Sequence, residues 1–247
     1  MKFKAILVFT LLSFSLVAQN GSYGPPPPPD EANSPDIWGA RYFHFGLNFT
    51  PGIYWLTSNT SNNTTNGASF GYGYGANLEF YFTRNYGFLT GFEVTQIGAK
   101  YTNTTALNTF IDSIVKHDET VQYLQIPFEL KLKTVPFKNM RYYGLVGLNF
   151  GFRLKATDNY FSENYNSVSM APTPYYNEVS GNNANISSQT DFFRVSLIIG
   201  AGVEYSIAGS TALQASITYN NCFTNLNNTS SNAVNVKGIE LMLGILF

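Results

Sequence analysis

The sequence is poor in charge and almost free of cysteine. Lysine, arginine, aspartate and glutamate make up 12% of the 247 residues, roughly half the share usual in soluble domains, and the formal net charge is −1. A balance so close to neutral gives no reason to expect nucleic-acid binding. The single cysteine, Cys222, excludes an intrachain disulfide framework and a cysteine-based zinc cluster. No sequence pattern predicts another metal site, a cofactor or a phosphate loop.

Long hydrophobic runs are also missing, with one exception at the start of the chain. Lys2 and Lys4 precede an apolar run that extends from Ala5 to Val17. This run is too short and wrongly flanked for a membrane-spanning helix, and it is typical of a secretory signal peptide, which we assign to residues 1–18. No cysteine follows it, so a lipoprotein signal is excluded. We therefore expect an exported protein that no helix holds in a membrane.

A proline-rich segment follows at residues 19–40. Five consecutive prolines, Pro25 to Pro29, favour a polyproline II spacer without a packed core. We expect this segment to be a linker in the periplasm.

The chain is rich in aromatic residues and glycine, with 17 Tyr, 21 Phe and 21 Gly. In VQYLQIPFELKLK, residues 121–133, apolar side chains occupy one parity and polar or charged side chains the other. Such alternation predicts a β-strand, because successive side chains point to opposite faces. Similar segments occur at residues 41–55, 70–82, 86–101, 141–155, 192–205, 211–220 and 236–247.

Two all-β architectures fit eight such segments, a soluble sandwich and a membrane barrel. The segments are about 10–15 residues long, whereas soluble strands usually have about 5–6. Short connections alternate with long ones rich in Asn, Ser and Thr, which begin near Thr57, Thr102, Ala156 and Asn221. This alternation is typical of outer-membrane proteins. We predict an eight-stranded antiparallel up-and-down transmembrane β-barrel at residues 41–247, with its apolar face toward lipid and both termini in the periplasm.

Aromatic residues of the apolar parity gather near the ends of the segments, as expected for the girdles of a membrane barrel. Those expected at the short-turn end are Phe43, Phe82, Tyr86, Tyr142, Tyr205 and Phe247. Those expected at the other end are Trp55, Phe152, Phe193 and Tyr219. A soluble sandwich has no reason to sort aromatic side chains by height.

Charged residues of the opposite parity are predicted to face the barrel interior. They are Glu79, Glu93, Glu129, Lys131, Arg153, Arg194, Glu204 and Glu240. Eight strands leave room only for side chains, so we interpret this set as a structural network of ion pairs and hydrogen bonds. A gated conduction path is the alternative. His44 is expected in the interior, His117 in a solvated loop, and Cys222 at the start of a loop as a free surface thiol.

Three stretches resemble a known family: YLQIPFELKLK, YYGLVGLNFGFRL and the terminal GIELMLGILF. They are similar to the outer-membrane β-barrels of Bacteroidota, the PorT-like or "porin family" small barrels, over about residues 41–247. The resemblance implies a barrel in the outer membrane of a Gram-negative envelope. The terminal Phe247 with its alternating apolar residues resembles the signal read by the barrel-assembly machinery during insertion. Some members of the family serve secretion or gliding machinery, and no functional residue set carries over.

These observations predict a non-enzymatic outer-membrane protein that contacts lipid and acts as a structural or interaction component, accessory to secretion or envelope machinery. An envelope partner would bind through the long loops, the largest at residues 156–190, or through the proline-rich segment. The first alternative is a narrow porin or transport accessory. The second is a lipid-modifying enzyme at the outer rim, for which His117 is the candidate base. No catalytic, cofactor-binding or metal residues are assigned.

Overall fold

The computed structural model describes residues 43–58, 63–83, 85–108, 111–166, 179–208, 211–227 and 234–247. The predicted signal peptide, the proline-rich segment and the first two residues of the predicted barrel, Arg41 and Tyr42, lie outside the described residues. Within the described ranges, no helix is long and apolar enough to cross a membrane.

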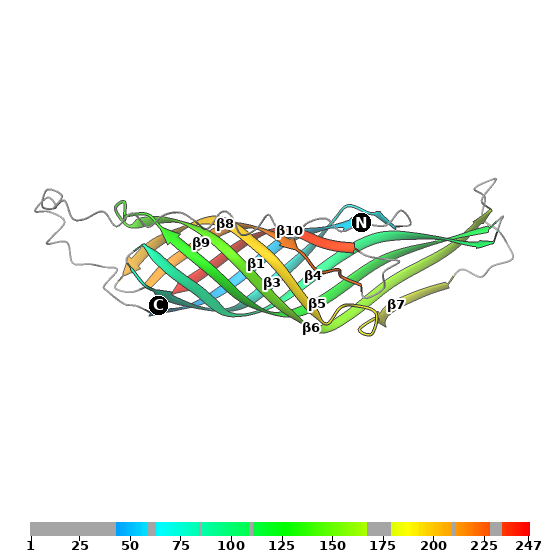
Figure 1. Cartoon of the computed structure of the whole chain (residues 1–247), viewed down its shortest axis with the longest axis horizontal. Coiled ribbons are helices and arrows are strands. Elements are labelled where there is room, and N and C mark those ends of the chain that lie inside the picture. Colours follow the sequence, from blue (N-terminus) through cyan, green and yellow to red (C-terminus); the bar gives the residue numbers. More distant parts are fainter. Residues whose placement is uncertain are drawn as a thin grey trace, which may run out of the picture. The chain divides into compact units, whose positions relative to one another are not determined.

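Ten antiparallel strands make up a single sheet (Figure 1). They are β1 (Phe43–Ser58), β2 (Asn63–Thr65), β3 (Ala68–Tyr81), β4 (Tyr86–Asn108), β5 (Ile111–Lys133), β6 (Met140–Asn166), β7 (Val179–Asn185), β8 (Phe193–Ala208), β9 (Thr211–Cys222) and β10 (Val234–Leu246). Strands β2 and β7 are short and pair with β4 and β6. The other eight strands each pair with a neighbour on both sides, which confirms the predicted eight-stranded barrel.

The first and last strands close the barrel. Strand β1 pairs with β10 from Gly46 opposite Leu246 to Ser58 opposite Val234. Within the barrel, closure leaves none of the eight long strands with a free edge. This matters in hydrocarbon, where an unpaired backbone N–H or C=O group costs several kcal/mol.

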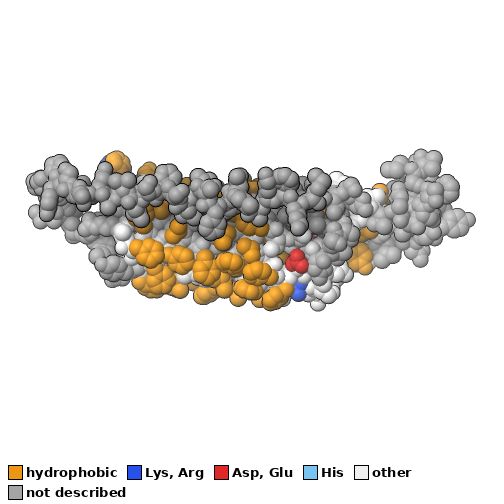
Figure 2. All heavy atoms as spheres, viewed as in Figure 1, with side chains coloured by type: hydrophobic (Ala, Val, Ile, Leu, Met, Phe, Trp, Pro, Cys, Tyr) orange, Lys and Arg blue, Asp and Glu red, His pale blue; other side chains and the backbone are white. Residues whose placement is uncertain are grey.

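Side chains alternate between an apolar outer face and a largely polar interior. On β10, Leu241, Leu243 and Ile245 are 42%, 46% and 41% exposed, whereas Glu240 and Met242, which point to the opposite side, are buried. Figure 2 shows hydrophobic side chains gathered in a broad band over the barrel wall. A soluble sandwich would bury this face. The predicted inversion, apolar outside and polar inside, is therefore what the structure has.

Glycines make room for large rings inside the narrow barrel. An added Cβ at Gly71 would lie 2.6 Å from the Tyr54 ring, and one at Gly238 would lie 2.5 Å from the same ring. Tyr54 is completely buried. Its ring thus fills the interior between strands β3 and β10, which have no side chain at those positions.

Three strands continue well past the apolar band and form a protruding sheet, which we call the extension: residues 97–108 of β4, 111–122 of β5 and 154–166 of β6, with β2 and β7 beside them (Figure 1). At about 3.3 Å per residue, the part on β5 alone adds roughly 40 Å of strand. Two regions expected to be loops, from Thr102 and from Ala156, are therefore largely strand. The extension was missed because its outer face meets water and lacks the apolar alternation that marks the barrel segments.

Candidate functional site

The barrel interior nearest the short turns holds a cluster of four charges, contributed by β3, β5 and β8. Lys131 Nζ lies 2.6 Å from Glu79 Oε1 and 2.6 Å from Glu204 Oε1. Lys133 Nζ lies 2.9 Å from Glu204 Oε2 and 3.8 Å from Glu79 Oε2. All four residues are buried. Two cations thus balance two carboxylates, as a buried charge requires.

Aromatic rings complete this charged cluster. Lys131 Nζ lies 4.2 Å from the centre of the Tyr143 ring, and Lys133 Nζ lies 4.0 Å from that of Tyr81. Tyr81 also donates a hydrogen bond to Glu79 and meets the His44 ring edge-on at 5.3 Å. His44 thus lies inside the barrel, near the short turns. Lys133 was not in the predicted set, although its parity matches that of Lys131.

Above this cluster, three glutamates surround a small cavity of about 60 Å³. Glu93 accepts hydrogen bonds from Asn48 (2.5 Å), Thr50 (2.8 Å) and Thr95 (2.7 Å). Glu240 accepts from the Tyr54 hydroxyl at 3.0 Å and from the Asn220 amide at 2.9 Å. Glu129 lines the same cavity and is buried. The space suffices for water molecules.

The two predicted arginines lie toward the opposite end. The buried Arg194 donates to Asn220 Oδ1 at 3.1 Å, and its guanidinium lies 5.5 Å from the centre of the Tyr123 ring. Arg153 is higher and half-buried, and it donates to the backbone carbonyl of Thr190. The eight predicted charges lie at different heights on the inner side of the wall, and Asn220 links Arg194 to Glu240.

An apolar cluster, which we call the cap, fills the interior above these layers. Its thirteen members are Tyr54, Leu56, Ile97, Ala99, Tyr101, Val121, Tyr123, Ala156, Ile186, Cys222, Leu226, Val234 and Val236. Ile186 and Leu226 come from the segments that follow β7 and β9. Backbone hydrogen bonds hold both, from Ile186 N to Ala156 O (3.2 Å) and from Leu226 N to Val234 O (2.7 Å). Hydrophobic burial thus closes the barrel where the strands leave the apolar band.

The aromatic residues predicted as girdles all lie on the outer face. Phe82 and Tyr86 flank one short turn, and Phe43, Tyr142, Tyr205 and Phe247 lie exposed at the same end. At the other end Trp55 contacts Tyr219, with ring centroids 6.4 Å apart, and Phe152 contacts Phe193 at 5.5 Å.

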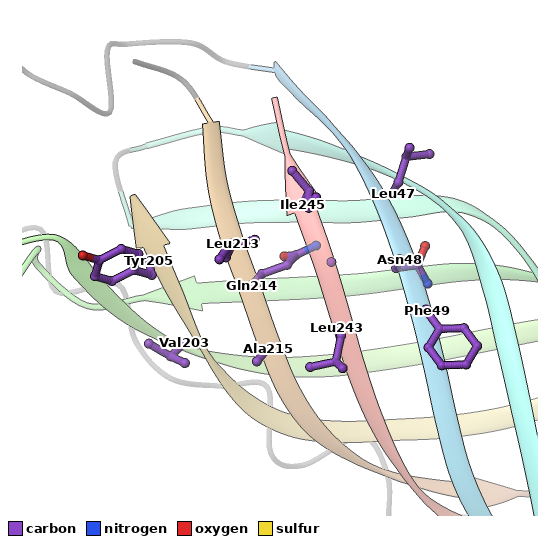
Figure 3. A pocket seen from close by; sticks show the side chains of 11 residues that line it. Leu47, Asn48, Phe49, Val203, Tyr205, Leu213, Gln214, Ala215, Leu243 and Ile245 are labelled. Atoms are coloured by element: carbon purple, nitrogen blue, oxygen red, sulfur yellow. The ribbon is translucent and has the colours of Figure 1, made fainter. Parts of the chain in front are cut away.

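A hollow of about 580 Å³ lies in the outer wall over β1, β10, β9 and β8 (Figure 3). Its rim includes Leu47, Phe49, Tyr205 and Leu213, and its floor includes the small Ala215. The hollow belongs to the apolar outer face of the barrel.

Two sequence expectations about single residues, Cys222 and His117, are wrong. Cys222 is the last residue of β9, not a surface thiol: it is 4% exposed and belongs to the cap. His117 lies in β5, not in a loop, on the inner face of the extension. Its ring stacks on Tyr101 at 4.7 Å, and its Nδ1 lies 2.6 Å from Asp158 Oδ2.

Neighbouring strands surround His117 with residues that the sequence did not connect to it. Tyr101 on β4 lies directly opposite His117, and Asp158 on β6 lies directly opposite Glu119. The Tyr101 hydroxyl donates to Glu119 Oε1 at 2.6 Å. Burial raises the pKa of Glu119 to about 7. The sequence did not predict this group, because its members come together only when β4, β5 and β6 pair in a particular register.

Comparison with known proteins identifies the kind of barrel. The family model for the outer membrane protein beta-barrel domain matches residues 18–228. None of the curated protein sequences matches the chain.

Several solved structures are similar to the chain. Ail, the attachment invasion locus protein of Yersinia pestis, is 15% identical, with 84% of this chain and 100% of that chain covered and a TM-score of 0.34. OprG from Pseudomonas aeruginosa is 13% identical, with 85% and 98% covered and a TM-score of 0.34. The protease OmpT from Escherichia coli is 7% identical, with 83% and 96% covered and a TM-score of 0.33. At such identities and TM-scores these likenesses carry no argument about function.

Proposed function

The chain belongs to the outer membrane protein beta-barrel domain family. We propose that it acts in the outer membrane as a closed, non-enzymatic barrel that presents an interaction surface. The observation that carries this proposal is the filled interior. A charged cluster blocks one end and the apolar cap blocks the other. A filled interior favours a function at the surface, and the extension of β4, β5 and β6 is the candidate surface.

The proposal includes an orientation. Residues 1–18 act as a signal peptide, residues 19–40 form a proline-rich periplasmic segment, and both ends of the barrel face the periplasm. The extension and the long connections then lie outside the cell, as long loops do in outer-membrane barrels. Insertion would use the barrel-assembly machinery. The resemblance to PorT-like barrels of Bacteroidota supports an accessory role in secretion or envelope machinery, with an envelope protein as partner.

Conductance of the purified, refolded chain in a planar bilayer tests the closed interior. We expect no stepwise current across voltage and pH, because any ion would have to pass both the charged cluster and the cap. A known porin reconstituted in the same way is the positive control. Stable steps that change in the Arg194→Ala variant would overturn the proposal and favour the narrow porin or transport accessory.

Two further measurements test the interaction role. Proteins that co-purify from native membranes with the intact chain should be lost when residues 102–116 are replaced by a short turn, or when residues 20–39 are deleted. Normal gel mobility of the unheated variants would show that the barrel still folds. Mass spectrometry of lipid A tests the enzyme alternative: a lipid modification that the His117→Ala variant abolishes would replace our proposal.

A further inference from the structure

Three groups that commonly bind metal ions meet on the inner face of the extension. His117 and Glu119 are two residues apart on β5 and therefore point to the same side. Asp158 on β6 pairs with Glu119 across the strands. One donor atom from each of the three lies within 4.8 Å of the others.

The carboxylates of this group have oxygen atoms that lack partners. Glu119 and Asp158 are each 3% exposed. Glu119 Oε2 and Asp158 Oδ1 are both buried, and neither has a hydrogen-bond partner in the described part of the chain. Buried carboxylate oxygens are normally hydrogen-bonded or bound to a metal ion. This observation is independent of the clustering, and it points to a ligand that carries positive charge.

A second layer of contacts orients the donors. Tyr101 stacks on the His117 ring, with an angle of 18° between the ring planes, and donates to Glu119 Oε1. The Tyr101 oxygen accepts a hydrogen bond from Asn227 Nδ2 at 3.3 Å. The hydrogen bond from the Tyr101 hydroxyl occupies Glu119 Oε1 and leaves Oε2 available. Second-layer contacts of this kind typically orient the ligands of metal sites.

We propose that His117, Glu119 and Asp158 form a binding site for a divalent transition-metal ion of the Zn²⁺ class. An imidazole nitrogen combined with carboxylate oxygens suits Zn²⁺, whereas Ca²⁺ and Mg²⁺ prefer oxygen donors alone. Two carboxylates neutralise the charge of the ion. Three protein ligands leave a fourth position for water or for a donor from a partner. The proposal goes beyond the proposed function and stands whether or not the barrel conducts.

Binding requires a small rearrangement of the donors, and His117 is the donor that reaches a surface hollow. Donors around a tetrahedral Zn²⁺ ion lie roughly 3.3 Å apart, as its bond lengths of about 2.0 Å dictate. The hydrogen bond between His117 and Asp158, 2.6 Å long, must therefore open as the ion enters. His117 lines a surface hollow of about 380 Å³ together with Lys116 and Tyr160. Lys116 faces this hollow with its charge partly offset by Glu163, 3.8 Å away.

Titration calorimetry of the tag-free, refolded full chain with ZnCl₂ tests the site. We expect one Zn²⁺ ion per chain, bound at least tenfold more tightly than Mg²⁺ or Ca²⁺. The His117→Ala, Glu119→Gln and Asp158→Asn variants should each weaken binding by at least tenfold. Replacing Zn²⁺ with Co²⁺ should give the visible absorption of a nitrogen- and oxygen-ligated ion, and His117→Ala should abolish it.

Asp118→Asn is the matched control. Asp118 lies between the two β5 ligands but is exposed and pairs with Lys100 at 3.4 Å, so its loss should leave Zn²⁺ affinity unchanged. Should a ligand variant fail to fold, Tyr101→Phe keeps the ring and removes only its hydroxyl, and it should weaken binding several-fold. Absence of saturable binding at millimolar Zn²⁺, or equal loss in Asp118→Asn and His117→Ala, would overturn the proposal. The first outcome would leave His117 and Asp158 as an ion pair only.

Discussion

At the scale of single residues, the barrel interior depends on charge balance. Lys131 touches both Glu79 and Glu204, and all three side chains are at most 1% exposed. Removing one partner of a buried ion pair is costly because the remaining charge has neither water nor a counter-ion. Replacing a whole pair by neutral groups of similar size is often tolerated.

We therefore expect Lys131→Met to lower the free energy of unfolding by about 3–5 kcal/mol. Urea unfolding in lipid vesicles, followed by tryptophan fluorescence, measures it. The double variant Lys131→Met/Glu204→Gln should recover part of the loss. Lys155→Met, at an exposed position of β6, is the control and should change stability by about 0.5 kcal/mol or less. A Lys131→Met variant as stable as the Lys155→Met control would show that the four charges do not act together.

At the scale of strands, two prolines mark breaks in the ladders of the closed barrel. Pro51 lies in the part of β1 where pairing with β10 skips from Phe49 to Gly52. Pro127 of β5 lies opposite Gly91 of β4, where pairing skips from Leu89 to Glu93. Proline has no N–H to donate, so it suits positions where a ladder is already interrupted.

Gly91 provides the backbone conformation of the second break. Its φ is +145°, and an added Cβ would lie 2.1 Å from the Ala76 carbonyl oxygen. We expect Gly91→Ala to lower the free energy of unfolding by about 2–4 kcal/mol, from backbone strain and overpacking together. Gly144→Ala is the control, since the nearest atom to its new Cβ would be 3.9 Å away. Equal yields of heat-modifiable, folded barrel from both variants would contradict this prediction.

At the scale of the whole molecule, the barrel has two interiors of opposite character. Within the apolar band most interior side chains are charged or polar, with a small apolar cluster of Leu89, Tyr143 and Leu145 among them, and the cap fills the interior above. Cys222 lies in the cap and is the single thiol of the chain, so it reports directly on whether the cap excludes water.

We expect Cys222 of the folded protein to react with a maleimide at least tenfold more slowly than in the heat-denatured chain. Leu226→Ala should speed the reaction several-fold, because removing a buried side chain opens a cavity beside the thiol. Leu154→Ala, at a 55% exposed position on β6, should not. Mass spectrometry of timed samples measures the rates. Rapid labelling of the unaltered protein would show that water reaches the cap.

The sequence alone determined the architecture of the barrel. Alternation in segments such as residues 121–133 is a local property, since it follows from the two-residue period of a strand, and it was enough to predict eight strands with an apolar exterior. The eight charges that strand parity places in the interior are buried or half-buried in the structure.

Only the tertiary structure decided which side chains meet. Strand pairing brings Lys131 of β5 to Glu79 of β3 and Glu204 of β8, and no local pattern encodes the relative height of strands that are far apart in the chain. The same holds for the cap, which loop residues Ile186 and Leu226 complete. It holds also for the group around His117, because Tyr101, Glu119 and Asp158 belong to three strands and only the pairing of those strands brings them together.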